Sequence, residues 1–105
     1  MEMDDPNEVV LIAEATALPG KRDELLRAVL EGLIPKALAE PDVSVFRLHE
    51  DRDQAGRFML YERFHNGGSV ESHFTAEHFA TISEALAELA EGGEPKITYY
   101  EVLTD

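Results

Sequence analysis

The sequence lacks cysteine and tryptophan entirely, and it is poor in positive charge. Without cysteine, disulfides, iron–sulfur clusters and thiolate zinc sites are excluded, and the redox compartment cannot be inferred. Lysine and arginine number 9 against 22 aspartates and glutamates, so the formal net charge is −13. No basic stripe is present to neutralise phosphates, so the composition argues against nucleic acid and against an anionic membrane surface as partners.

Long hydrophobic runs are also missing. No apolar run approaches the roughly 20 residues that a membrane-spanning helix needs. The acidic start at residues 1–5 is unlike a signal peptide, so we expect a cytoplasmic protein. A chain of 105 residues suffices for one domain with a real core. We therefore expect a single domain over residues 1–105, with residues 1–7 as a flexible leader.

Hydrophobic periodicity predicts six elements in the order strand, helix, strand, strand, helix, strand. The predicted strands span residues 8–16, 43–50, 57–64 and 97–103, and the predicted helices span 21–40 and about 77 to the Gly92-Gly93 pair. Pro35 should kink the first helix, and Pro41 should end it. This order is that of the ferredoxin-like βαββαβ arrangement, an α+β fold in which both helices cover one face of an antiparallel sheet.

The other face of this predicted sheet also needs a cover. Alternation places apolar side chains there, among them Met59, Tyr61, Tyr100 and Val102 or their alternates. An exposed apolar area of that size usually marks an interface. A two-fold homodimer that packs sheet on sheet is the simplest solution, so we expect the protein to bind a second copy of itself.

The stretch 57–79 holds most of the polar and aromatic candidates. Alternation in its strand places Glu62 on the same face as Phe58, Leu60 and Phe64, where a carboxylate is costly without a partner. Three interpretations stay open for Glu62. It orients a neighbouring histidine, as a carboxylate does in a catalytic triad, or forms a structural ion pair with a nearby arginine, Arg47 or Arg63. Alternatively, it is a buried anchor for the broken helix, held by the amides of a helix N-terminus.

The segment after that strand predicts an inward-facing histidine. Val70, His73 and Phe74 share one apolar stripe, but this stripe does not align with that of the following helix, so we infer a break near residues 75–77. His73 therefore faces the sheet, either as a proton-accepting base or as a core histidine bonded to a strand. His78 lies about 140° from it on an ideal helix, so the spacing does not predict a metal site.

Several motifs resemble the antibiotic biosynthesis monooxygenase (ABM) domain family. They are the strand end Tyr61-Glu62-Arg63-Phe64, the segment 72–79, Pro19-Gly20-Lys21 before the first helix and Glu40-Pro41-Asp42 before the second strand. The resemblance implies a dimeric α/β barrel, with a pocket in each subunit between helices and sheet. Known members include quinol and anthrone-type oxygenases that work without metal or flavin, an isomerase of autoinducer breakdown, and haem-degrading enzymes.

Among these activities, the resemblance favours a cofactor-independent monooxygenase that oxidises a quinol-like or polyphenolic aromatic with molecular oxygen. Its implied catalytic residues are His73 as base and Glu62 as its orienter, and its implied substrate-binding residues are Phe64, Phe74, His78 and Phe79. No cofactor and no metal are expected. Haem degradation is not expected, because those members use an asparagine, a histidine and a tryptophan, and this chain has Ala13 and Phe64 near the first and last positions.

Two alternative functions remain at this point. One is a dimer that binds a small molecule on the same scaffold without turnover, because a fold does not guarantee an activity. The other is an isomerase of a small phosphorylated ketone, which would need a cationic residue in the pocket. Arg47 and Arg63 are the obvious candidates for that residue. The two histidines outside these motifs, His49 and His65, are predicted to lie on the surface.

Overall fold

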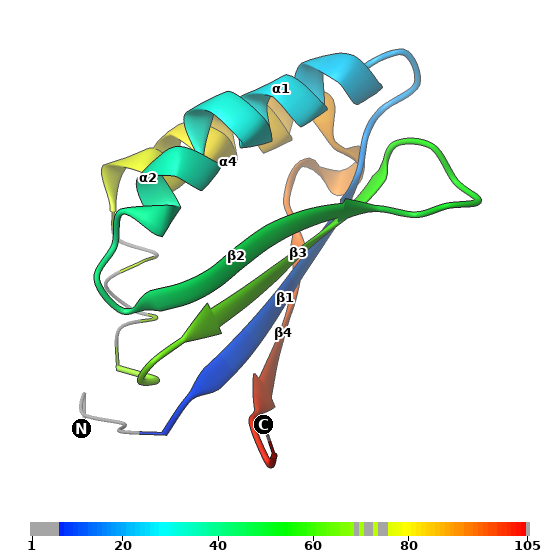
Figure 1. Ribbon diagram of the computed structural model, residues 1–105. Helices are drawn as coiled ribbons and strands as arrows, with labels where there is room; N and C mark the ends of the chain where they lie inside the picture. The colour runs from blue at the N-terminus through cyan, green and yellow to red at the C-terminus, as the bar shows by residue number, and fades with distance from the viewer. Residues whose placement is uncertain (1–6, 69, 71–72, 74–75, 105) are drawn as a thin grey trace.

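The computed structural model describes residues 7–68, 70, 73 and 76–104 and shows two layers, one of helices and one of sheet (Figure 1). The strands are β1 (Val9–Thr16), β2 (Val43–Glu50), β3 (Arg57–Phe64) and β4 (Lys96–Glu101). The helices are α1 (Arg22–Gly32), α2 (Ile34–Leu38), α4 (Glu77–Leu89) and the short 3-10 helix η1 (Glu91–Gly93). Most of the predicted leader, residues 1–6, and the predicted pocket residue Phe74 lie outside the described residues.

The sheet has the order β2-β3-β1-β4, and each neighbouring pair is antiparallel. This order, with α1, α2 and α4 on one face, confirms the predicted ferredoxin-like α+β fold (Figure 1). Leu11 is paired with Glu62 on one side and with Tyr99 on the other. Directly opposed residues point to the same face of a sheet, so these three side chains share the face that the helices cover.

The first predicted helix is divided in two. α1 ends at Gly32, Leu33 joins the halves, and α2 carries Pro35 in its first turn. Proline lacks the backbone N–H that a helix interior needs but fits the first turn, where that N–H would have no partner. The predicted kink is therefore present as a break just before Pro35. The last strand ends at Glu101, two residues before the predicted end.

The main core lies between the sheet and the helices. Phe46, Phe58 and Leu60 project from the sheet, and α1 and α4 cover them from above. The helices contribute buried Leu25, Val29, Ile82 and Leu86 to the same cluster. Burial of side chains of this size contributes roughly 1.5–3 kcal/mol each, so this layer holds α1 and α4 against the sheet. Within the described part of the chain, no helix is long and apolar enough to cross a membrane.

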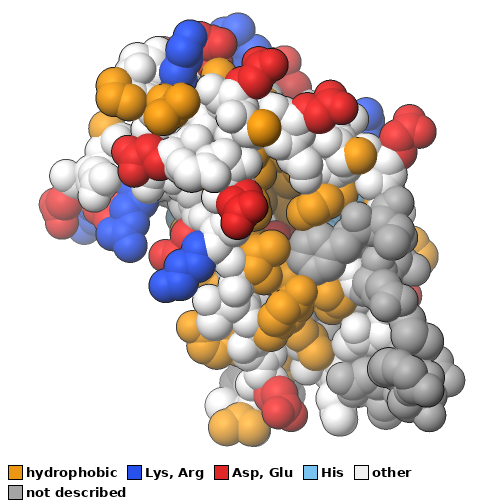
Figure 2. Space-filling model, turned by 180° about the vertical axis from the view of Figure 1, so that it is seen from behind, with side chains coloured by type: hydrophobic (Ala, Val, Ile, Leu, Met, Phe, Trp, Pro, Cys, Tyr) orange, Lys and Arg blue, Asp and Glu red, His pale blue; other side chains and the backbone are white. Residues whose placement is uncertain are grey.

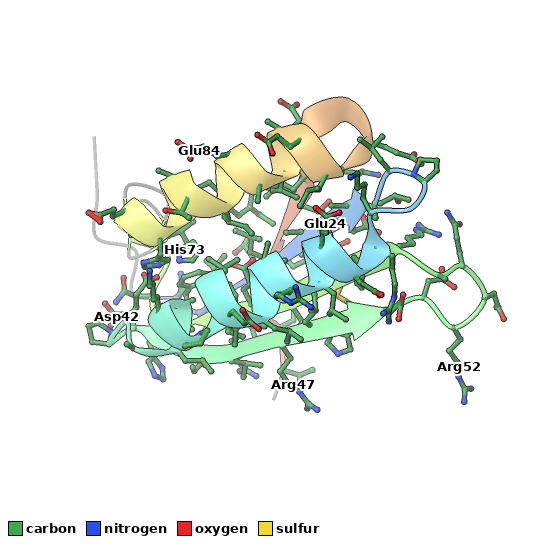
Figure 3. All side chains as sticks on the ribbon, turned by 90° about the horizontal axis from the view of Figure 1, so that it is seen from above. Glu24, Asp42, Arg47, Arg52, His73 and Glu84 are labelled. Atoms are coloured by element: carbon green, nitrogen blue, oxygen red, sulfur yellow. The ribbon has the colours of Figure 1, made fainter. Side chains whose placement is uncertain are left out.

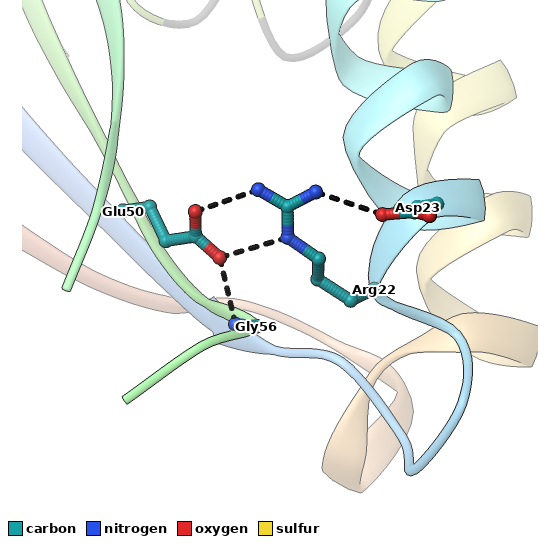
Figure 4. A network of polar contacts seen from close by, with 4 residues as sticks. All are labelled: Arg22, Asp23, Glu50 and Gly56. Carbon is teal, nitrogen blue, oxygen red and sulfur yellow. Dashed lines mark hydrogen bonds and ion pairs between the residues drawn. The ribbon is translucent and has the colours of Figure 1, made fainter. Parts of the chain in front are cut away.

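An ion pair fixes the start of α1 to the β2–β3 hairpin (Figure 4). Nε and Nη2 of Arg22 donate to the carboxylate of Glu50 at 3.0 and 2.8 Å. The backbone N–H of Gly56 donates to the same carboxylate at 2.8 Å. The hydrogen bond from Arg22, followed by that from Gly56, lowers the pKa of Glu50 to about 2. Gly56 has a φ of 88°, a conformation that suits glycine at this turn.

None of the described helices lies over the opposite sheet face (Figure 1). The register places Ile12 beside Tyr61, and Val10 beside Tyr100, on that face. Seen from behind, the molecule has hydrophobic side chains gathered in a hollow below the helical layer, with charged side chains mostly above them and to the left (Figure 2). Tyr100 is 52% exposed. Self-association through this face stays a prediction, supported by its apolar character.

Candidate functional site

His73 lies inside the molecule, as the sequence pattern predicted. Its side chain is 1% exposed, and Figure 3 shows it close to the start of α4. Three aromatic rings surround the imidazole: Phe64 at 5.3 Å, Phe46 at 5.7 Å and Phe79 at 5.7 Å between ring centroids. The sheet supplies the first two of these and α4 supplies Phe79. The ring is therefore held in an apolar enclosure, where a polar partner has a strong effect.

Glu40 provides that partner. Its Oε2 atom accepts a hydrogen bond from Nδ1 of His73 at 2.8 Å and another from Nε2 of His78 at 2.7 Å. Glu40 lies in the turn between α2 and β2, and its side chain is 19% exposed. The sequence analysis used Glu40 only as part of a family motif and missed this role. The available signal was its position directly before Pro41, where the chain must leave the helix.

His73 and His78 meet at this carboxylate because the helix is interrupted between them. Ala76 has the extended backbone angles φ −69° and ψ 147°, and α4 begins only at Glu77. The 140° separation on an ideal helix therefore does not apply. The two rings are 6.0 Å apart between centroids. The break that the sequence predicted near residues 75–77 thus gathers two histidines and one glutamate at the end of the helical layer.

Glu62 lies on the other side of the His73 ring. Its side chain is 4% exposed, and its Oε1 atom lies 3.5 Å from Nε2 of His73. This distance is within ion-pair range, yet Oε1 has no hydrogen-bond partner, so the contact is not aligned as a hydrogen bond. Burial, followed by repulsion from Glu40, raises the pKa of Glu62 to about 8. Glu62 is therefore mostly a neutral acid at pH 7.

The alternative ion pair between Glu62 and an arginine is wrong. Arg47 is opposite Tyr61 in the register and lies on the other sheet face, and Figure 3 shows its side chain pointing away from the helices. Arg63, next to Glu62 in the strand, also projects from the opposite face, where its Nη2 donates to Glu8 at 2.6 Å. Alternation of side chains along β3 separates both arginines from Glu62.

A cavity of about 50 Å³ lies next to His73 and Glu62. The remaining lining is almost wholly apolar and comes from the sheet, α1 and α4. It includes Leu11, Leu25, Val29, Phe58, Leu60, Phe79, Ile82 and Leu86. Of the predicted substrate-binding residues, Phe79 lines this cavity, whereas Phe64 and His78 contact the His73 ring from outside the described lining. His49 and His65 are exposed, as predicted.

A larger hollow of about 470 Å³ is a shallow groove between α1 and α4. Its described lining includes Glu24, Arg27 and Thr81, and none of the candidate site residues. The chemistry therefore points to the smaller cavity, where a histidine held by Glu40 and a mostly neutral carboxylic acid border an apolar space. This arrangement is suited to proton transfer with a ligand that is shielded from water.

Comparison with known proteins fits this geometry. The family model described as antibiotic biosynthesis monooxygenase, ABM, matches residues 8–92. The chain belongs to this family. The matched range contains all the ABM residues discussed above, including Glu40, Glu62, His73 and His78. A search of curated proteins found no match to the chain.

Solved structures of other proteins share the ABM fold seen here. PA3566 from Pseudomonas aeruginosa is 28% identical, with a TM-score of 0.82 over 93% of this chain and 96% of that one. Rv0793 from Mycobacterium tuberculosis is 26% identical, with a TM-score of 0.83 over 93% and 97%. A crystal structure named antibiotic biosynthesis monooxygenase is 19% identical, with a TM-score of 0.82 over 91% and 99%, and shows the fold alone. Family and fold together support a monooxygenase-like or small-molecule-binding role.

Proposed function

We propose that this ABM-family protein is a cofactor-independent monooxygenase that oxidises a quinol-like or polyphenolic aromatic with molecular oxygen. One observation carries the proposal: Nδ1 of His73 donates to Glu40 at 2.8 Å, which orients the imidazole and makes Nε2 the ring nitrogen that we assign as the base. That nitrogen faces Glu62 at the border of the apolar cavity. A phenolic hydroxyl placed there would be held next to a base of fixed orientation and away from bulk water.

The chemistry begins with proton transfer from the substrate hydroxyl to Nε2 of His73. Such a step contributes about 10²- to 10⁴-fold to a rate. The resulting anion is electron-rich and gives an electron to oxygen, and recombination forms a bond between oxygen and a hydrogen-bearing ring carbon ortho or para to the hydroxyl. One oxygen atom stays on that carbon as a carbonyl, and the other leaves as water with the hydroxyl hydrogen and the hydrogen of that carbon. The substrate thus becomes a quinone and supplies all the electrons.

The residues around His73 have separate roles in this proposal. Glu40 orients the ring and stabilises its cation, as a carboxylate does in a triad. Glu62, the orienter expected from the sequence, borders the opposite ring nitrogen and completes the polar end of the cavity. Phe79 forms part of the wall against which a flat ring packs. Phe64 supports the imidazole edge-on from the sheet.

The cavity volume sets a condition on binding. A space of about 50 Å³ has room for a few water molecules, since each needs at least roughly 10–15 Å³. An aromatic ring is larger, so side chains of the wall must move when a substrate enters. Phe79 is the natural candidate because it lies in the first turn of α4, next to the interruption at Ala76.

Oxygen consumption with a panel of hydroquinones and naphthols tests the proposal. His73→Ala and His73→Gln should lower kcat by at least about 100-fold, because the base is removed. His49→Gln, which changes an exposed histidine, is the matched control and should retain full activity. Unchanged oxygen uptake in both His73 variants would remove the mechanism. Quinone and water should form in equal amounts in the wild-type reaction.

A ligand-binding role without turnover is the second candidate, and the nearly wholly apolar lining of the cavity favours it. Recovery of a bound aromatic in chemically unaltered form, with no oxygen uptake, would support this role over catalysis. The isomerase alternative finds less support. The described lining of the cavity includes no lysine or arginine to hold a phosphate, and Arg47 and Arg63 project from the other sheet face.

A further inference from the structure

We infer that Glu40, His73 and His78 form a binding site for a divalent transition-metal ion of the zinc class. Nδ1 of His73, Nε2 of His78 and a carboxylate oxygen of Glu40 all lie within 4.8 Å of one another. Two imidazole nitrogens and one carboxylate oxygen are a known ligand set for zinc, with a further position left for water. The three residues come from the α2–β2 turn, the segment before α4 and α4 itself, so the fold brings them together.

The distances between the three ligand atoms can be compared with those of a metal-bound site. Glu40 Oε2 is 2.8 Å from Nδ1 of His73 and 2.7 Å from Nε2 of His78, because hydrogen bonds now join these atoms. Ligands bound to zinc at about 2.0–2.2 Å in a tetrahedron lie about 3.3–3.5 Å apart. The ligand atoms therefore need to separate by roughly half an ångström. Rotation of the Glu40 side chain, which projects from a turn, is enough to provide this.

The carboxyl group of Glu62 lies beside the ring nitrogen of His73 that would not bind the metal. A histidine that binds a metal through one nitrogen usually donates its other N–H to a carboxylate or carbonyl, which fixes the ring and strengthens the ligand. In this structure Glu62 Oε1 lies 3.5 Å from Nε2 of His73, is fully buried and has no hydrogen-bond partner. With a metal on Nδ1, Nε2 would carry the proton and supply the donor that Glu62 lacks.

Electrostatics and access also favour a cation here. Glu40 and Glu62 flank one imidazole from opposite sides. A divalent ion bound here would place positive charge beside these two acidic side chains. The side chains of Glu40 and His78 are 19% and 12% exposed, so an ion can reach the ligand atoms from solvent. The nitrogen and oxygen ligands suit Zn²⁺, Ni²⁺, Co²⁺ or Cu²⁺ better than Mg²⁺ or Ca²⁺.

Metal binding would oppose the proposed catalysis, an effect that depends on the proposed function. A metal on Nδ1 forces the ring proton onto Nε2, the nitrogen that otherwise accepts the proton of the substrate. Zn²⁺ should therefore inhibit oxygen uptake. The binding itself does not depend on that activity, so the two proposals fail separately.

Calorimetric titration of the chelator-treated, full-length protein with Zn²⁺ tests the site. We expect one ion per chain and a rise in melting temperature, because an ion that binds only the folded state stabilises it. Glu40→Gln and His78→Gln should each weaken Zn²⁺ binding by at least about tenfold. His49→Gln and His65→Gln, which change exposed histidines, are the matched controls and should bind as the wild type does. Circular dichroism verifies that each variant is folded.

The Co²⁺-loaded protein gives a second readout, since visible absorption of Co²⁺ reports tetrahedral coordination by nitrogen and oxygen. Absence of Zn²⁺ binding to the wild type would overturn the proposal, as would equal affinity in the folded Glu40 and His78 variants. Binding lost in the exposed-histidine controls would instead place the ion elsewhere and equally overturn it. Zn²⁺ binding without any oxygen uptake would uphold the site and count against the proposed function.

Discussion

Nδ1 of His73 lies 2.8 Å from Oε2 of Glu40, although 33 positions separate the two residues in the chain. This hydrogen bond sets which ring nitrogen carries a proton and directs the other toward Glu62 and the cavity. It links the turn after α2 to the segment that precedes α4. Both proposals above use this pair, one as an oriented base and the other as two metal ligands.

The first prediction concerns Glu40 as a positioning residue. Glu40→Gln keeps the size of the side chain but removes its charge, and an uncharged amide oxygen accepts more weakly from two N–H groups. We expect kcat for oxygen uptake to fall by about tenfold or more with a smaller change in KM, since ring orientation is used in the chemical step. Steady-state kinetics in metal-free buffer measure this split. A change in KM alone would show that Glu40 serves binding only.

The second prediction concerns the buried carboxyl of Glu62. Because its pKa rises from 4.5 to about 8 on folding, the folded state binds more protons than the unfolded state between these values. Stability should therefore be greatest below pH 4.5 with respect to this group, and should fall as the pH rises to about 8. The loss is on the order of 5 kcal/mol, since each pKa unit corresponds to about 1.4 kcal/mol.

Glu62→Gln should remove this loss. We expect the variant to unfold at higher urea concentration than the wild type at pH 8, and the two proteins to differ less at pH 5. Urea unfolding curves in buffer with a chelator give the unfolding midpoints at both pH values. Glu84→Gln, at an exposed position of α4 (Figure 3), is the control and should follow the wild type. A wild-type protein whose stability rises through this window would contradict the burial argument.

The third prediction concerns the corner formed by Arg22 and Glu50. The pKa of Glu50 is lowered to about 2 by its hydrogen bonds with Arg22 and Gly56. Its contribution to stability is therefore complete above the ordinary value of 4.5 and is lost as the pH falls toward 2. Glu50→Gln should lower the melting temperature at pH 7 and differ less from the wild type at pH 2.5. Arg22→Met should lower the melting temperature at pH 7 in the same way. The double variant should have a melting temperature no lower than that of either single variant.

The fourth prediction concerns self-association through the uncovered sheet face. Tyr61→Arg places a charge in the middle of that face, beside Ile12, and should convert a dimer into a monomer. Leu30→Arg, at a position 47% exposed on α1, is the control and should leave the assembly unchanged. Size-exclusion chromatography with light scattering gives the mass. A monomeric wild type at micromolar concentration would contradict the expected dimer.

The sequence predicted the fold well because the fold follows from local patterns. Alternation marked the strands, three- and four-residue spacing marked the helices, and Pro35 marked the break, which the structure places at Leu33. Alternation also placed Glu62 on the helix-covered face, and the mismatch of two apolar stripes placed His73 inside. These results need only the period of each element and the cost of exposing apolar side chains.

The partners of these residues could not be predicted in the same way. Both arginines considered for Glu62 project from the opposite face, and the carboxylate that holds His73 comes from the α2–β2 turn, which the sequence marked only by a family motif and by Pro41. The sequence by itself determined the order of elements and the inward position of two polar groups. Only the tertiary structure decided which groups meet. The contact of Glu40 with His73 and His78 depends on how the α2–β2 turn packs against the start of α4, and no local sequence pattern encodes the distance between these two segments.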